Sequence, residues 1–147
     1  MTAAHLDRLA HLDRLFGLHG KTALVTGGTR GIGMMIARGL LQAGASVVIS
    51  SRKADAVDAA VTALAEFGPV RGVAADLSRR SECARLAADV LAHSGALDIL
   101  VNNAGATWGE PLETFPAEAW DRLLDLNLKS PFWMVQELLP GLRRAGT

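Results

Sequence analysis

The stretch TGGTRGIG, residues 26–33, decides the fold predicted for this chain. It follows a short apolar run over 22–26 (TALVT), and after it apolar residues recur at helical spacing. A glycine-rich turn between a strand and a helix is typical of a dinucleotide fingerprint, although the spacing here is GxxxGxG rather than GxGxxG. A purely structural tight turn is the alternative explanation.

Three glycines of this turn have distinct roles under the dinucleotide hypothesis. Gly27 allows a sharp turn, Gly31 lets backbone approach a pyrophosphate, and Gly33 allows the helix to pack closely on the strand. The start of the helix offers unpaired N–H groups and the positive end of its dipole to phosphates. The cofactor-binding residues predicted in this turn are Gly27, Thr29, Arg30, Gly31, Ile32 and Gly33.

The periodicity alternates regularly along the rest of the chain. Strands are predicted over 22–26, 46–50, 70–75 and 97–101, and helical apolar stripes over 32–43, 56–67, 83–91, 116–124 and 128–144. This order predicts a parallel sheet with helices on both faces, because each parallel step needs a crossover. The expected fold class is α/β, a doubly wound parallel (Rossmann) sheet, represented here by its first four strands and their helices, with the fourth strand beside the first.

Residues 1–15 precede this pattern and contain the sequence HLDRL twice, at 5–9 and 11–15. We interpret them as an N-terminal extension, either mobile or a short helix with its leucines on one side. An oligomer contact is the alternative. Residues 16–147 are predicted to form one dinucleotide-binding domain.

Composition narrows the function classes. Lys and Arg number 15, as do Asp and Glu, and this zero balance argues against nucleic acid as the main partner. No apolar run reaches the length of a membrane helix, and the first residues do not resemble a secretory signal. The single cysteine, Cys83, excludes an internal disulfide and a CxxC metal site and fits a reducing compartment. We therefore expect a cytoplasmic protein without a metal, membrane or nucleic-acid partner.

Four motifs directly follow predicted strands or lie at the start of the last predicted helix. They are the glycine turn at 26–33, Asp76-Leu77 after the third strand, Asn102-Asn103-Ala104-Gly105 after the fourth, and Asn127 in LDLNLKS. In this order they resemble the short-chain dehydrogenase/reductase family, from about Phe16 to the last residue. Within the family, the stretch NNAGATWGEPLETFP is similar to NADPH-dependent 3-oxoacyl-[acyl-carrier-protein] reductases, including the type tied to rhamnolipid synthesis.

The residues that end the second strand indicate which nucleotide is bound. An acidic residue there would bind both ribose hydroxyls and favour NAD, but this chain has SSRK at 50–53. The planar guanidinium of Arg52 is suited to a 2′-phosphate, and Arg30 in the glycine turn is predicted to face the same region. In the family such a basic pair accompanies NADP, so NADP (NADPH) is the expected cofactor. For Arg52, a solvated loop cation is the alternative.

The resemblance also implies an adenine side of the site. Asp76 would accept from the adenine amino group and Leu77 would lend a backbone N–H, with a turn or helix-cap role before Ser78 as the alternative for Asp76. Small residues after the fourth strand would let the backbone pass close to the adenine ribose. The predicted cofactor-binding residues outside the glycine turn are Ser51, Arg52, Asp76, Leu77, Asn103, Ala104 and Gly105.

The family transfers a hydride between the nicotinamide and the carbonyl carbon of a small-molecule substrate. A Tyr hydroxyl acts as general acid or base, a Lys four residues later lowers its pKa, a Ser positions the carbonyl, and an Asn binds a water in a proton relay. Of these groups only the Asn has a counterpart, Asn127, for which a helix-kink residue without a chemical role is the alternative. The chain contains no Tyr, and its lysines lie in no Tyr-x-x-x-Lys.

Two interpretations follow from these absences. The segment is either the N-terminal part of a longer reductase, truncated before the catalytic Ser, Tyr and Lys, or a dinucleotide-binding or interaction module. The unguarded edge of strand 97–101 favours the first interpretation, and a separate chain pairing there is a third possibility. We expect the 147 residues alone to be inactive. We also expect the apolar stripe of helix 128–144 to join copies into a homodimer or homotetramer.

Overall fold

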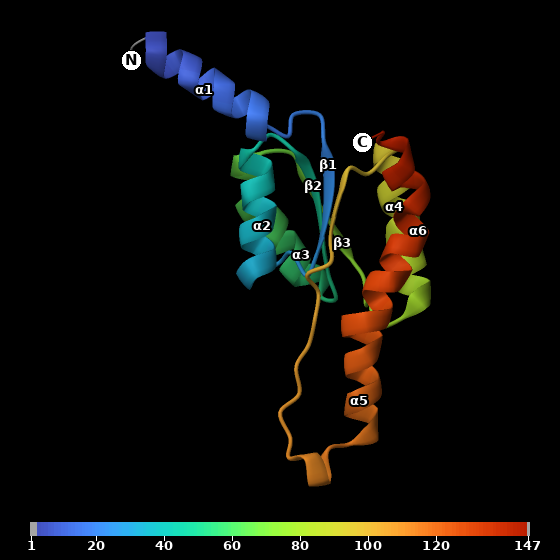
Figure 1. The fold of residues 1–147 in the computed structure, drawn as a ribbon. Coiled ribbons are helices and arrows are strands. Elements are labelled where there is room, and N and C mark those ends of the chain that lie inside the picture. Colours follow the sequence, from blue (N-terminus) through green and yellow to red (C-terminus); the bar gives the residue numbers. More distant parts are fainter. Residues whose placement is uncertain (1–2, 147) are drawn as a thin grey trace.

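The computed structural model describes residues 3–146 and places a four-stranded sheet between two layers of helices (Figure 1). The strands are β1 (Thr22–Thr26), β2 (Ser46–Ser51), β3 (Val70–Ala74) and β4 (Ile99–Val101). The helices are α1 (Ala3–Phe16), α2 (Gly31–Gln42), α3 (Ala54–Leu64), α4 (Arg80–Ser94), α5 (Ala117–Leu124) and α6 (Ser130–Arg144). The element order therefore agrees with the alternation predicted from the sequence.

The sheet has the order β3-β2-β1-β4, and all three strand pairs are parallel. Leu24 lies opposite Val48 on one side and Leu100 on the other, so β1 is central. This confirms the doubly wound fold and the place of the fourth strand beside the first. β4 is shorter than the predicted strand over 97–101: the amide of Leu97 donates to the carbonyl of Gly141 in α6, and the amide of Asp98 donates to Thr22 of β1 just before the strand begins.

The side chains of the strands alternate between two apolar layers. Val25 and Ile49 belong to the layer covered by α2 and α3, whereas Leu24 and Val48 belong to the layer covered by α4 and α6. Each of these side chains is buried, and burying one such side chain contributes roughly 1.5–3 kcal/mol. The two-sided burial explains why the strands read as continuous apolar runs rather than as alternating ones.

The N-terminal segment forms a helix, α1, which extends away from the layered body (Figure 1). The side chains of Leu6, Leu12 and Leu15 are exposed, and the side chain of Leu9 lies outside the described part of the structure. Asp13 connects this helix to the next turn, because its carboxylate lies 3.0 Å from the His19 ring. The helical alternative is confirmed; the boundary of the extension and its role in oligomer contact stay predictions.

The segment between the two predicted helices over 116–124 and 128–144 is itself helical. A π-helical turn, Asp125–Lys129, joins α5 to α6, so the regular helix begins at Ser130. On α6, Met134 and Leu138 are fully buried, whereas Phe132 remains 65% exposed. The helix therefore carries apolar side chains on a second, uncovered face. Among residues 3–146, no helix combines the length and apolar character needed to cross a membrane.

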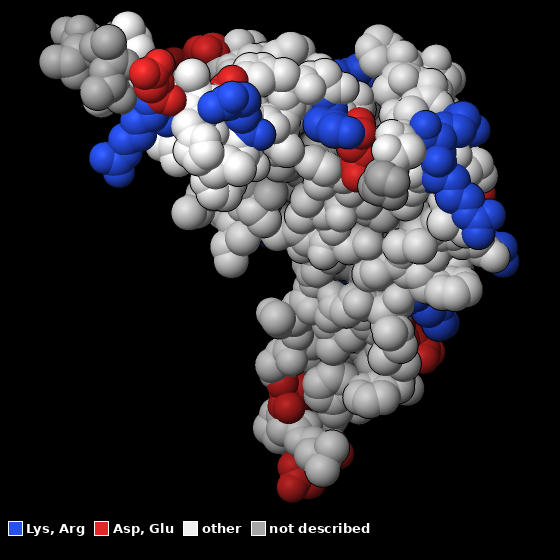
Figure 2. All heavy atoms as spheres, turned by 45° about the horizontal axis from the view of Figure 1, so that its top comes forward, with Lys and Arg blue, Asp and Glu red and all other residues white. Residues whose placement is uncertain are grey.

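Charged side chains are dispersed on the face shown in Figure 2. Basic and acidic groups lie apart or in small mixed groups across largely uncharged surface there. One contact between opposite charges, Lys21 with Asp98 at 2.8 Å, joins the segments that lead into β1 and β4. The positive and negative side chains, which balance in the whole chain, are thus not separated into a basic half and an acidic half on this face.

We expect Asp98→Asn to destabilise the fold by about 1 kcal/mol at neutral pH, because Lys21, the partner, is half exposed. The ammonium of Lys21 and then the backbone N–H of Thr22 hold the pKa of Asp98 below its ordinary value of 3.8. The stabilisation is therefore present above about pH 4 and is lost as pH falls through the lowered pKa. Urea unfolding at pH 7 and pH 3 checks this: the difference between the two proteins should shrink at pH 3, and an unchanged difference would refute it.

Candidate functional site

A cavity of about 400 Å³ lies at the carboxyl ends of the strands, beside the start of α2. All cofactor-binding residues predicted from the sequence line it, with the exception of Asp76. The ligand sites of open parallel sheets lie at this edge, near the point where the strand order reverses. In this sheet the reversal falls between β1 and β4.

The glycine turn forms one wall of the cavity, and its geometry accounts for the glycines. Gly27 has a φ of +67° and Gly31 a φ of +54°, which are conformations that side chains with a Cβ rarely adopt. Gly33 is buried, and a Cβ there would lie far inside van der Waals contact with the Gly27 carbonyl oxygen and the Asn103 side chain. The sharp turn at Gly27 and the close packing at Gly33 are thus observed, and the approach of a pyrophosphate to Gly31 stays a prediction.

The start of α2 faces the cavity without a side-chain cap. Arg30 is the N-cap residue, and its extended backbone leads into a helix whose first residues are Gly31, Ile32 and Gly33. The N–H groups of the first helical turn have no partner within the helix and carry a partial positive charge. An anionic group of a ligand can accept hydrogen bonds from these N–H groups.

Hydrogen bonds of Thr26 and Asn103 join the ends of β1 and β4 beside the cavity. The Thr26 hydroxyl donates to the Val101 carbonyl (3.2 Å) and accepts from the Asn103 backbone N–H (3.0 Å). The Asn103 side-chain amide donates to the carbonyls of Thr26 (2.9 Å) and Gly27 (3.2 Å). Asn103 therefore braces the two strands while it lines the cavity.

Asp76 lies outside the cavity lining. One oxygen of its carboxylate accepts from the Ser78 hydroxyl (2.8 Å) and from the Ser78 backbone N–H (3.3 Å). This is the turn role that the sequence analysis gave as the alternative. Leu77, the next residue, does line the cavity. A contact between Asp76 and adenine stays a prediction.

Asn127 also lies outside the cavity lining, within the π turn between α5 and α6. Its amide oxygen accepts from the Ala106 N–H (2.9 Å), and its amide nitrogen donates to the Ala106 carbonyl (2.8 Å). The side chain thus holds the segment that follows Gly105 by both of its polar atoms. This contact positions the chain beyond the cavity, and the role of Asn127 in a proton relay stays a prediction.

Three residues of the cavity were missed by the sequence analysis: Ser50, Ala75 and Leu126. The Ser50 hydroxyl is fully buried and has no hydrogen-bond partner among the described residues. Its position at the carboxyl end of a predicted strand could have identified Ser50 as a cavity residue from the sequence. Leu126 gave no such signal, because only the π turn brings it to the cavity.

The charge of the lining is positive. Arg30 and Arg52 are its only ionisable residues, and no carboxylate pairs with either one among residues 3–146. A guanidinium without a fixed partner can bind a phosphate with two hydrogen bonds. The cavity therefore suits a ligand with several phosphate charges, one beside these two arginines.

A doubly wound sheet with a glycine turn, an uncapped helix start and a basic cavity at the reversal point defines the class of dinucleotide-binding proteins. The family model described as short chain dehydrogenase matches residues 21–147. The chain belongs to the short chain dehydrogenase family.

Relatives in this family are similar over most of the chain. A rhamnolipids biosynthesis 3-oxoacyl-[acyl-carrier-protein] reductase of Pseudomonas aeruginosa is 48% identical over 90% of this chain and 52% of its own length. A D-beta-hydroxybutyrate dehydrogenase of Rhizobium meliloti is 41% identical over 86% of this chain and 50% of its own length. The chain thus spans about half the length of the curated relatives it matches.

Solved structures agree with this placement. The Pseudomonas aeruginosa RhlG/NADP active-site complex matches with a TM-score of 0.87 and 48% identity, over 90% of this chain and 52% of that chain. A metagenomic short-chain oxidoreductase in complex with NADP matches with a TM-score of 0.82 and 41% identity, over 87% of this chain and 59% of that one. The similarity to 3-oxoacyl reductases of the rhamnolipid type is thereby confirmed.

Proposed function

We propose that this chain forms the NADPH-binding part of a short-chain reductase that transfers hydride to a carbonyl, such as a 3-oxoacyl thioester. The observation that carries the proposal is the cavity that joins an uncapped helix start to Arg30 and Arg52. The two NADP complexes among the similar structures and the name of the Pseudomonas aeruginosa relative support the cofactor and the substrate class.

The residues present fit this cofactor. The amides that open α2 would bind the diphosphate, since Gly31 carries no Cβ and the space where one would lie is open. Arg30 and Arg52 would bind the 2′-phosphate. The buried Ser50 hydroxyl, which has no partner within residues 3–146, would gain one from the ligand.

The adenosine half would lie between two further walls of the cavity. The backbone of residues 103–105, after β4, would pass the ribose, because Ala104 and Gly105 leave space there. Ala75 and Leu77, after β3, would provide an apolar surface for the adenine.

The reduced nicotinamide of NADPH supplies the hydride when the cofactor is bound. Asn127 binds Ala106 through two hydrogen bonds and so positions the segment between the cavity and α5. The proton for the substrate oxygen must come from another group, because the family's Tyr has no counterpart in the sequence. We therefore propose that reductase activity needs residues beyond these 147, and that residues 16–147 act as their cofactor-binding part.

The absence of tyrosine also favours a second candidate function, a module that binds the dinucleotide without reducing a substrate. Both candidates predict cofactor binding, and turnover distinguishes them. A fused segment that carries the Ser and the Tyr-x-x-x-Lys of the family would give carbonyl-dependent NADPH oxidation under the first candidate only.

We further propose that copies associate through α6 into a homodimer or homotetramer. Phe132, Val135 and Leu139 form an exposed apolar row on this helix, which a partner would cover.

We expect the purified chain to bind NADPH saturably and at least about tenfold more tightly than NADH. The reason is that each charge-assisted hydrogen bond to the 2′-phosphate is worth roughly 1.5–3 kcal/mol, and 1.4 kcal/mol corresponds to a factor of ten. Fluorescence titration of the two reduced nucleotides measures this ratio. Equal affinities would refute the assignment to NADPH, and no binding of either nucleotide would refute the dinucleotide site itself.

A further inference from the structure

The adenine-side wall of the cavity is a short irregular segment between β3 and α4. Ala75 and Leu77 line the cavity and are 4% and 3% exposed. β3 is the last strand on its side of the sheet, so only one of its edges is paired. The wall therefore depends on contacts other than the sheet ladder for its position.

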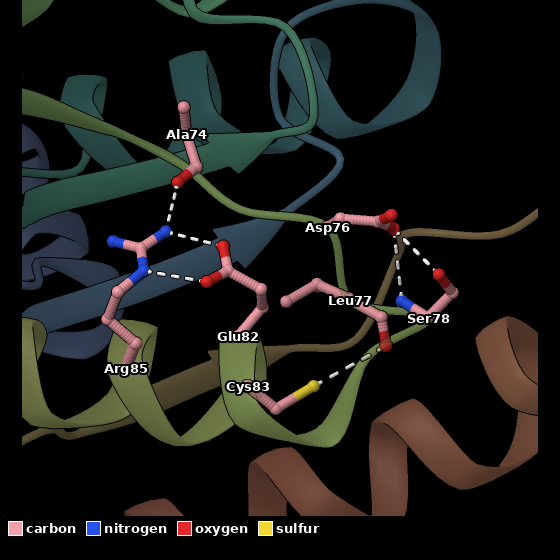
Figure 3. A network of polar contacts seen from close by, with 7 residues as sticks. All are labelled: Ala74, Asp76, Leu77, Ser78, Glu82, Cys83 and Arg85. Atoms are coloured by element: carbon pink, nitrogen blue, oxygen red, sulfur yellow. Dashed lines mark hydrogen bonds and ion pairs between the residues drawn. The ribbon is translucent and has the colours of Figure 1, made fainter.

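Arg85 of α4 holds the beginning of this wall (Figure 3). Its guanidinium donates to both oxygens of Glu82, at 3.0 and 2.8 Å, and to the backbone carbonyl of Ala74. The Ala75 amide donates to Ser51 of β2, so the carbonyl of Ala74 points to the open edge, where no strand can pair with it. Arg85 supplies the partner that the missing strand would have provided.

The ion pair fixes the direction of the guanidinium. The hydrogen bonds from Arg85, and to a smaller extent the backbone N–H of Asp76, keep the pKa of Glu82 below its ordinary value. Glu82 therefore stays ionised at neutral pH and holds the planar group of Arg85 toward the strand end.

Cys83 of the same helix holds the end of the wall (Figure 3). Its thiol, which is fully buried, donates to the carbonyl of Leu77 at 3.4 Å. Burial raises the pKa of Cys83, so the sulfur keeps its proton and remains a donor.

We infer that α4 positions the adenine-side wall through Arg85 and Cys83, which hold the carbonyls at its two ends. Neither side chain lines the cavity, so both are positioning residues for nucleotide binding and neither is a contact residue. The consequence for the ligand rests on the proposed NADPH function, whereas the effect on the wall itself does not.

A second ion pair provides a matched control. Arg71 of β3 donates to both oxygens of Asp89 of α4, at 2.8 and 2.7 Å, and so joins the same two elements. It lies nearer the other end of the strand, outside the cavity lining. A variant of Asp89 therefore removes a contact between α4 and β3 without removing either hydrogen bond to the wall.

The test compares Arg85→Gln, Cys83→Ala and Asp89→Asn by hydrogen exchange of the free protein. We expect the amides of residues 75–78 to exchange about three- to tenfold faster in the first two variants and at the unchanged rate in Asp89→Asn. Cys83→Ser retains a donor and should restore most of the protection. Unchanged exchange over 75–78 in both Arg85→Gln and Cys83→Ala, or an equal change in Asp89→Asn, would overturn the inference.

Titration with adenosine 2′,5′-bisphosphate and with inorganic pyrophosphate measures the consequence for binding. We expect Arg85→Gln to lose roughly three- to tenfold in affinity for the bisphosphate and nothing for pyrophosphate, because only the first ligand reaches the wall. Equal losses for both ligands would show that Arg85 acts on the whole fold and would overturn the inference. If the unchanged protein binds neither ligand, the proposed function fails, and the hydrogen exchange still decides the positioning role.

Discussion

Replacing Arg52 by Ala should weaken NADPH binding by about 10- to 100-fold and leave NADH binding almost unchanged. Arg52 lines the cavity, follows β2 directly, and has no carboxylate partner among the described residues. A hydrogen bond from a charged donor is worth roughly 1.5–3 kcal/mol, which corresponds to one to two decades of affinity. NADH has no 2′-phosphate, so the loss should be confined to the phosphorylated nucleotide.

The neighbouring Lys53 is the matched control for this experiment. It carries the same charge one residue further along, but it lies outside the cavity lining, where it is the N-cap residue of α3. We expect Lys53→Ala to change NADPH affinity by less than about threefold, because a charge outside the cavity acts on the ligand only through electrostatics screened by salt. Fluorescence titration of both nucleotides with both variants measures the four affinities. An equal loss for NADPH and NADH in Arg52→Ala, or equal effects of the two variants, would contradict the assignment.

The parts of the site that the sequence predicted are those fixed by local backbone geometry. Gly27, Gly31 and Gly33 were assigned roles because each such role excludes a Cβ, and the structure places them accordingly. The strand order followed from the crossover rule for parallel strands. The glycine roles need only the residues of the turn itself, and the strand order needs only the alternation of strands and helices along the chain.

The parts that escaped prediction depend on contacts between distant segments. Leu126 reaches the cavity only because the π turn shifts it, and periodicity cannot reveal an inserted π turn. The hydrogen bond between Asn127 and Ala106 joins residues that are 21 positions apart in the sequence. Leu97, which was predicted to belong to the fourth strand, likewise contacts a distant segment, because its amide donates to the carbonyl of Gly141 in α6.

Asp76 illustrates a different limit. The sequence places it at the carboxyl edge of the sheet, but a carboxylate that follows a strand can either bind a ligand or close a turn. In the structure one of its oxygens already accepts two hydrogen bonds from Ser78. The same residue pattern is compatible with both roles, and only the geometry separates them.

The largest structural effect is expected from Gly33→Ala, which should destabilise the fold by about 3 kcal/mol or more. The added Cβ would meet the carbonyl oxygen of Gly27 and the side-chain nitrogen of Asn103 far inside contact distance. Overpacking usually costs about 1–3 kcal/mol, and here the backbone at Gly27 and the bonded Asn103 leave little room to relax. Because relaxation would move the start of α2 away from β1, the diphosphate site should be lost together with the stability.

Gly39→Ala in the same helix separates this steric effect from the general effect of a helical alanine. Gly39 is exposed, and nothing lies within 4 Å of the position that its Cβ would occupy. Alanine there should stabilise α2 by roughly 0.5–1 kcal/mol, since glycine loses more backbone entropy on folding. Chemical unfolding and NADPH titration of both variants therefore should give effects of opposite sign on stability and a loss of binding in Gly33→Ala alone. A Gly33→Ala protein that unfolds at the normal denaturant concentration and binds NADPH would show that α2 does not need its close approach to the glycine turn.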